Sequence, residues 1–179
     1  MYTVEHLRHL FAYNDWANRR SIVAVRSSNS ERSHQILAHL LITEKEYYER
    51  LYGKDSTGFD FWPKLSIEEC GTLARETAEQ FEKLLRRFDE DGLTLTTRYK
   101  TSEGLDHENT FREILTHILF HSSIHRGNIV LKLREDGFEP AGLRRDTATS
   151  RFIAPPEDSD AAEVSCRFRH GNGSEFVIA

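Results

Sequence analysis

The sequence contains few cysteines, no long apolar run and no excess of basic residues. Its two cysteines, Cys70 and Cys166, are far apart and in no metal-binding or redox spacing. We therefore expect free thiols rather than a disulfide framework. The longest apolar runs are too short to span a bilayer, which argues against a membrane protein.

Charge and the missing motifs narrow the function classes further. Lys and Arg total 24 against 29 Asp and Glu, for a formal net charge of -5. Nucleic-acid binding needs a basic face, so we expect no nucleic-acid partner. The first ten residues, MYTVEHLRHL, lack the basic start and apolar core of a signal peptide, and we expect a cytoplasmic protein. A Gly-rich phosphate loop, a serine elbow and internal repeats are also missing.

What the sequence does contain is helical periodicity. Apolar residues recur at helical spacing in four segments, residues 3–25, 30–52, 66–91 and 110–136. Residues 93–108, rich in Thr and Tyr, predict a short β-hairpin across one end of the bundle. We assign residues 1–150 to one helical domain and residues 151–179 to a C-terminal tail, either a short hairpin or disordered.

Three histidines form a stripe on the last of these helices. His117, His121 and His125 follow one another at intervals of four, so they lie on one helix face. Two neighbours in this stripe can bind one metal ion, but the outer two are about 12 Å apart along the axis, too far to share it. The pair is therefore either His117 with His121 or His121 with His125. A third ligand must come from another helix.

His39, among leucines in the second helix, is the candidate for that third ligand, with a packed core histidine as the alternative. Glu44 and Glu46 are the nearest acids downstream, and we expect both on a solvated helix face, with at most one of them at the edge of the site. His6 and His9 are expected at the surface. The loop of residues 53–65, rich in Gly and aromatic residues, could cover a pocket.

Three segments, in this order, resemble the DinB family of metal-binding four-helix bundles, also called the DinB/YfiT-like superfamily. They are YNDWANRR at residues 13–20, AHLLITEKEYY at 38–48 and HILFHSSIHRGNI at 117–129. The resemblance covers roughly residues 1–136. It departs from the family at Asn128, where the family has Gln after His-Arg-Gly, and the chain beyond about residue 150 matches nothing in the family pattern.

The resemblance carries expectations about fold and site. We expect an all-α protein, an up-down-down-up four-helix bundle with a small β-hairpin before the fourth helix and a short irregular C-terminal tail. The family pattern implies His39, His121 and His125 as metal ligands, with His117 as a neighbour of the site. It also implies a homodimer. Known family members include metal-dependent thiol transferases and a thiol-dependent isomerase, and many others are named only for induction by DNA damage.

Three neutral histidines leave an open coordination position, which is typical of catalytic sites. We therefore expect a metal-dependent thiol S-transferase that joins a small-molecule thiol to an electrophile. Zn²⁺ is the first expectation for the metal, with Ni²⁺, Fe²⁺ and Mn²⁺ as alternatives. The competing hypotheses are a non-catalytic metal-binding stress-response protein, a metal-dependent hydrolase with Glu44 as a speculative base, and an interaction module in which the histidines are incidental.

Overall fold

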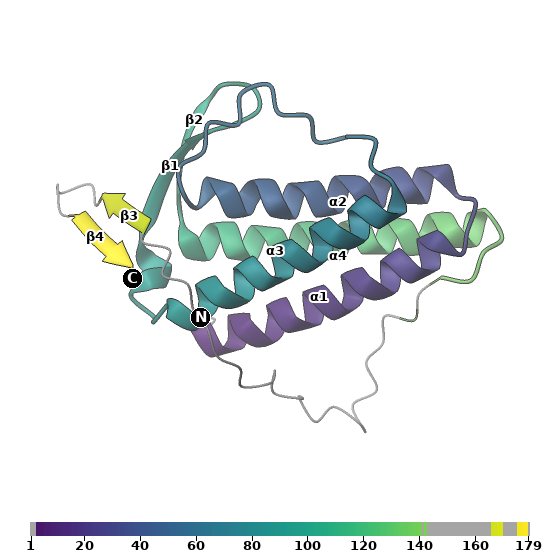
Figure 1. Cartoon of the computed structure of the whole chain (residues 1–179), viewed down its shortest axis with the longest axis horizontal. Coiled ribbons are helices and arrows are strands. Elements are labelled where there is room, and N and C mark those ends of the chain that lie inside the picture. Colours follow the sequence, from purple (N-terminus) through teal and green to yellow (C-terminus); the bar gives the residue numbers. More distant parts are fainter. Residues whose placement is uncertain (1–2, 141, 143–165, 170–174, 179) are drawn as a thin grey trace. The chain divides into compact units, whose positions relative to one another are not determined.

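The computed structural model describes residues 3–140, 142, 166–169 and 175–178. The chain divides into two compact units, Met1–Ala141 and Gly142–Ala179. The first unit contains four long helices, α1 (Val4–Arg26), α2 (Glu31–Arg50), α3 (Ile67–Arg87) and α4 (Phe111–Glu135), shown in Figure 1. The predicted domain boundary at residue 150 lies outside the described residues.

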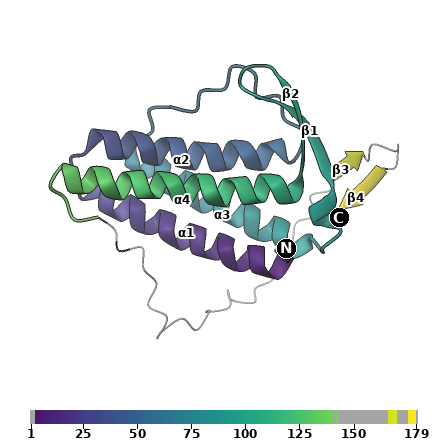
Figure 2. The same ribbon diagram turned by 180° about the vertical axis from the view of Figure 1, so that it is seen from behind.

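The four helices form a bundle of the expected up-down-down-up type. Figures 1 and 2 show α1 and α4 running in one direction and α2 and α3 in the other. The long connection between α2 and α3 returns the chain to the end at which α2 began, so these two consecutive helices are parallel. The most extensive contacts between helices are those of α1 with α3 and of α2 with α4. The candidate site lies between α2 and α4.

The helix starts follow from capping residues in the sequence. A hydroxyl side chain at each N-cap accepts a hydrogen bond from a backbone N–H in the first turn; these residues are Thr3, Ser30, Ser66 and Thr110. Glu69 and Glu113 complete capping boxes at α3 and α4. Three helices agree with the predicted ranges to within two residues at each end. The third helix was predicted to reach residue 91 but ends at Arg87, because Phe88 adopts an extended backbone and buries its ring.

A β-hairpin precedes α4, as predicted. β1 (Thr96–Lys100) pairs antiparallel with β2 (Asp106–Thr110), from Thr96 opposite Thr110 to Lys100 opposite Asp106. Thr110 ends β2 and caps α4, so the hairpin leads directly into the helix that carries the histidine stripe. The turn of this hairpin is therefore fixed relative to α4.

The apolar core explains why the bundle holds its shape. Leu37, Leu40 and Leu41 of α2 are fully buried against residues of α3 and α4. Burial of each such side chain contributes roughly 1.5–3 kcal/mol. Cys70 belongs to this core as a free thiol, and burial raises its pKa to about 11. It is therefore held as the unreactive thiol at neutral pH.

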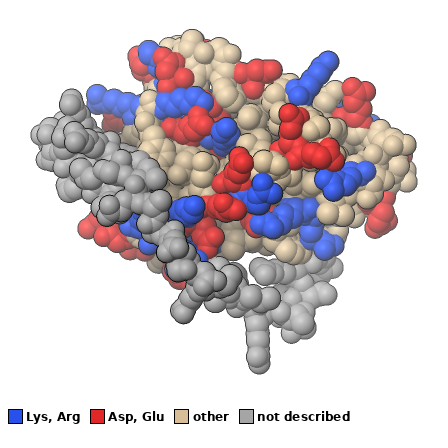
Figure 3. All heavy atoms as spheres, viewed as in Figure 1, with Lys and Arg blue, Asp and Glu red and all other residues tan. Residues whose placement is uncertain are grey.

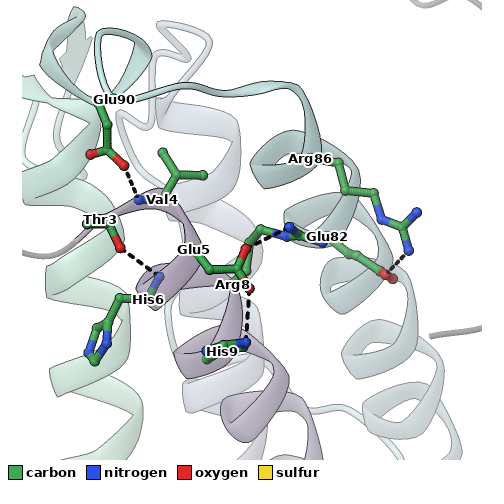
Figure 4. A network of polar contacts seen from close by, with 9 residues as sticks. All are labelled: Thr3, Val4, Glu5, His6, Arg8, His9, Glu82, Arg86 and Glu90. Carbon is green, nitrogen blue, oxygen red and sulfur yellow. Dashed lines mark hydrogen bonds and ion pairs between the residues drawn. The ribbon is translucent and has the colours of Figure 1, made fainter. Parts of the chain in front are cut away.

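The start of α1 is held by polar contacts at the surface (Figure 4). The Val4 backbone N–H donates to Glu90 at 2.8 Å, which ties α1 to the segment after α3. His9 Nε2 lies 3.0 Å from Glu5, and both side chains are exposed. His6 is likewise exposed, so His6 and His9 are surface histidines, as expected.

Acidic and basic side chains are interspersed on the face shown in Figure 3, which gives that face no continuous basic area among the described residues. Within the part of the chain that the structure describes, no helix is both long and apolar enough to cross a membrane.

The second unit contains β3 (Cys166–Arg169) and β4 (Glu175–Ile178), which pair antiparallel. Most of residues 151–179 lies outside the described residues, so the choice between a hairpin and disorder for this tail stays a prediction.

Candidate metal centre

Three of the predicted site residues lie together between α2 and α4. His39 comes from α2 and His121 and His125 from successive turns of α4, and one ring nitrogen from each lies within 4.8 Å of the others. Nitrogens bound to one zinc ion lie about 3.4 Å apart, given bonds of about 2.0–2.1 Å, so a small rotation of the side chains would close this group on an ion. Of the two pairs that the spacing allowed, the structure brings His121 and His125 together with His39.

His117 occupies a different place. Its ring stacks on Tyr47 at 4.6 Å between centroids and lies 5.8 Å from the ring of His121. Its side chain is exposed, and its nitrogens are not part of the three-histidine group. His117 is therefore a neighbour of the group, as the family pattern implied.

The tautomer of His39 follows from its hydrogen bond. Nδ1 lies 2.7 Å from the backbone carbonyl oxygen of Phe61. A carbonyl can only accept, so Nδ1 carries the proton and donates it. Nε2 of the neutral ring is then left with a lone pair for a ligand, the arrangement usual for metal-binding histidines.

His121 and His125 each bury an Nδ1 atom that has no hydrogen-bond partner among the described residues. Leaving a buried polar atom unpaired costs about 1–3 kcal/mol. Burial, followed by the proximity of His125, His39 and His117, lowers the pKa of His121 to about 3. Burial also lowers the pKa values of His125 and His39. All three rings are therefore neutral at pH 7, the form that binds metals, and the group could hold a divalent metal ion.

The loop of residues 53–65, which we call the aromatic loop, covers His39, in line with the sequence-based expectation. The Trp62 ring stacks on His39 with centroids 4.0 Å apart and an angle of 8° between planes. The guanidinium of Arg32 lies 5.2 Å from the centre of the Trp62 ring on which it stacks. Together with the Phe61 carbonyl, this stacking fixes the orientation of the His39 ring.

An open cleft of about 410 Å³ adjoins the histidine group. Side chains of α2, the loop of residues 53–65, the β1–β2 hairpin and α4 line it: His39, Thr43, Tyr47, Arg50, Phe61, Thr101, Ser102, Glu103, Leu105, His107, His117 and His121. Two of the three clustered histidines therefore face a space large enough for a small molecule.

A second polar cluster, which the sequence analysis did not predict, lies in the bundle interior. Asn14 Nδ2 and Ser122 Oγ donate to Glu44 at 2.7 and 2.6 Å, and Asn18 Nδ2 donates to both Glu44 oxygens at 3.0 Å. Arg126 Nη1 donates to the amide oxygens of Asn14 and Asn18 at 2.6 and 2.8 Å. We call these five residues the amide network. Each segment that carried the family resemblance contributes to it.

Burial opposes both charges in the amide network. It raises the pKa of Glu44, against the lowering effect of the hydrogen bonds from Ser122, Asn14 and Asn18. It lowers the pKa of Arg126, against the raising effect of the Glu44 charge. The two asparagine amides connect the carboxylate to the guanidinium, so neither charge is left without hydrogen bonds.

Two expectations about polar residues were wrong: Glu44 and Glu46 were expected on a solvated helix face but are 4% and 1% exposed. Asn18 is buried as well, at 2% exposed. Asn18 and Glu44 are buried because they belong to the amide network, and Glu46 is buried because Lys54 Nζ pairs with it at 2.9 Å. The signal that could have revealed the network is the matched i, i+4 spacing of Asn14 with Asn18 and of Ser122 with Arg126.

Comparisons with known proteins agree with this architecture. The model of the DinB family matches residues 1–151. Protein DinB of Bacillus subtilis (strain 168) is 25% identical over 149 residues, a match that covers 74% of this chain and 87% of that protein. No solved structure matches the chain. With a family match over most of its length, the chain belongs to the DinB family.

Proposed function

We propose that the chain binds one divalent metal ion through His39, His121 and His125. The orphaned Nδ1 atoms, the neutral rings and the hydrogen bond that fixes the His39 tautomer all support these ligands. Zn²⁺ is the first choice for three imidazoles, and Ni²⁺, Fe²⁺ and Mn²⁺ are alternatives that depend on metal availability.

We propose further that this site serves a thiol S-transferase reaction. The observation that carries the proposal is the cleft of about 410 Å³ beside the histidines, lined by Tyr47, Phe61 and Arg50. A structural zinc site is closed by four protein ligands, whereas three ligands beside an open cleft leave room for a substrate.

The chemistry divides between the ion and the protein. A bound metal ion would lower the pKa of a substrate thiol and favour the thiolate, the form that attacks electrophiles. The chain supplies the geometry: the Phe61 carbonyl and the Trp62 ring orient His39, and the aromatic wall of the cleft holds the substrate beside His39 and His121.

Two alternatives make different predictions. A non-catalytic metal-binding stress-response protein would hold the metal without turnover. A metal-dependent hydrolase would need a base, and Glu44 is poorly suited because its oxygens accept hydrogen bonds from Asn14, Asn18 and Ser122 and because it does not line the cleft.

The test is a transfer assay with zinc-loaded protein, cysteine or 2-mercaptoethanol as the thiol and monochlorobimane as the electrophile. We expect thioether fluorescence to appear faster than with metal-free protein, and His121→Ala to abolish the difference. Stoichiometric zinc without any acceleration over a panel of thiols would favour the non-catalytic alternative.

We also propose that the chain forms a homodimer. Phe120, Ile124 and Leu131, spaced to lie on one face of α4, are 61%, 64% and 58% exposed. Light scattering should give twice the chain mass, and Ile124→Arg should shift it to the monomer. A monomeric wild type would contradict this proposal.

A further inference from the structure

Arg50 is the most unusual charged residue of the cleft. It lies in the last turn of α2, lines the cleft and is only 4% exposed. Its Nε–H donates to Ser56 Oγ at 3.1 Å, and a further polar contact reaches Tyr99. No described carboxylate lies within 4.0 Å of its guanidinium, in contrast to the paired cations Lys54 and Arg19.

Aromatic rings replace the missing counterion. The guanidinium carbon lies 4.5 Å from the ring centre of Tyr47, 5.0 Å from that of Tyr99 and 5.5 Å from that of Phe61. Cation–π contacts offset part of the cost of burying the charge. They leave the outer donors of the guanidinium without an anionic acceptor, because a ring face cannot accept a bidentate pair.

A series of stacked side chains connects Arg50 to the histidine group. Arg50 stacks on Tyr47, Tyr47 stacks on His117, and the His117 ring lies 5.8 Å from His121. Burial lowers the pKa of His117, and the positive charge of Arg50 lowers it further. The same cleft is therefore lined by a guanidinium and by two candidate metal ligands, His39 and His121.

The other lining residues indicate which anion would fit. Arg50 is the only arginine or lysine among the described lining residues, and Thr101 and Ser102 add hydroxyl donors, whereas the Thr43 hydroxyl already donates to the His39 carbonyl at 2.7 Å. One cation with two hydroxyls suits a monoanion such as a carboxylate better than a doubly charged phosphate. Glu103 is the only acid among these residues and is exposed on the hairpin turn, where water screens its charge.

We propose that the cleft binds a small carboxylate-bearing substrate, with the carboxylate on the Arg50 guanidinium and the reacting end beside His39 and His121. This inference rests on the proposed function for the identity of the reacting end, a thiol. The carboxylate contact itself involves only Arg50 and the neighbouring hydroxyls.

Calorimetric titration of the zinc-loaded, full-length protein tests the inference. The probes are 3-mercaptopropionate, its methyl ester, which removes the charge, and propionate, which lacks the thiol. We expect the charged thiol to bind at least about tenfold more tightly than the ester, the gain typical of a charge-assisted hydrogen bond. Propionate should bind measurably and should compete with 3-mercaptopropionate.

Two variants test whether Arg50 is responsible for the preference for the charged thiol. Arg50→Met keeps an unbranched stem against the rings and should remove the preference for the charged thiol, and Arg50→Lys should retain part of it. Arg20→Met is the matched control, because Arg20 also lies over a ring, Trp16 at 5.4 Å, but on α1. Zinc stoichiometry and the helical circular dichroism signal establish that each variant is folded.

The outcomes separate this inference from the proposed function. Equal binding of acid and ester by the wild type, no binding of any carboxylate at millimolar concentration, or an unchanged preference in Arg50→Met would overturn the carboxylate site. Arg50-dependent binding of propionate in a protein that transfers no thiol would contradict the transferase and leave the carboxylate site standing.

Discussion

Two polar clusters involve both α2 and α4, and they differ in whether their polar atoms have hydrogen-bond partners. In the amide network, Glu44 accepts hydrogen bonds from three side chains, and Arg126 donates to two amide oxygens. In the histidine group, Nδ1 of His121 and of His125 is buried without a partner among the described residues. A polar cluster whose atoms all have hydrogen-bond partners stabilises the fold and positions its helices, whereas buried polar atoms without partners indicate a binding site for a ligand.

The two clusters are also connected through α4. Ser122 and Arg126 of the amide network each follow a histidine of the group, His121 and His125, by one residue. The amide network therefore fixes the rotation of α4 about its axis, and this rotation points both histidines at His39. We expect substitutions in the amide network to reduce mainly the stability of the fold, and substitutions of the histidines to reduce mainly metal binding.

The largest expected effect on stability comes from breaking the amide network on one side. Glu44→Leu or Arg126→Met alone leaves the opposite charge buried and should lower the free energy of unfolding by about 3–5 kcal/mol. The double variant should lose less than the sum of the two, because it leaves no unpaired charge. Urea denaturation of the metal-free proteins measures all four corners of this cycle. Additive losses would contradict the coupling that the hydrogen bonds predict.

Metal removal should have an intermediate effect, because the apolar core of the bundle does not include the histidine group. A ligand at 100 times its Kd stabilises by about 2.7 kcal/mol, which for a chain of this size raises Tm by roughly 5–10 °C. Chelation of the wild type should lower Tm by that amount and should leave the Tm of His121→Ala unchanged. Complete unfolding on chelation would point instead to a structural metal.

The smallest loss of stability is expected from removing one hydrogen-bond donor of the amide network. Ser122 Oγ is fully buried and donates to Glu44 at 2.6 Å, while Glu44 keeps its bonds from Asn14 and Asn18. Ser122→Ala should therefore cost only about 1–2 kcal/mol. Its zinc content should equal that of the wild type, which thermal unfolding and metal analysis together would check. Loss of zinc in this variant would mean that the two clusters are not separable.

The sequence was sufficient for most of the fold because the helices carry their own signals. Capping residues such as Ser66 and Thr110 and the apolar periodicity act locally, so their consequences can be worked out without a partner helix. The stripe of histidines likewise limits the ligand pairs by geometry alone. The choice of His39 needed the family resemblance, since no local rule says which helix faces α4.

The interior polar residues could not be predicted in the same way. Asn18 and Glu44 have the local character of solvated helix positions, and only the partners that α1, α2 and α4 bring together make their burial tolerable. The burial of Arg50 could not be predicted either, because a basic residue in the last turn of a helix is also favourable at the surface. Its enclosure by rings depends on Phe61 from the loop and Tyr99 from β1.

The central claim is that His39, His121 and His125 form one metal site, and elemental analysis of the purified chain without a histidine tag tests it most directly. We expect one metal ion per chain in the wild type and almost none in His39→Ala, His121→Ala or His125→Ala. His34→Ala is the control: His34 also lies on α2, and its buried Nε2 has no hydrogen-bond partner in the described part of the chain, but it is outside the three-histidine group, so the variant should keep its metal. Full metal occupancy in any of the three ligand variants, or no metal in the wild type after reconstitution, would contradict the account.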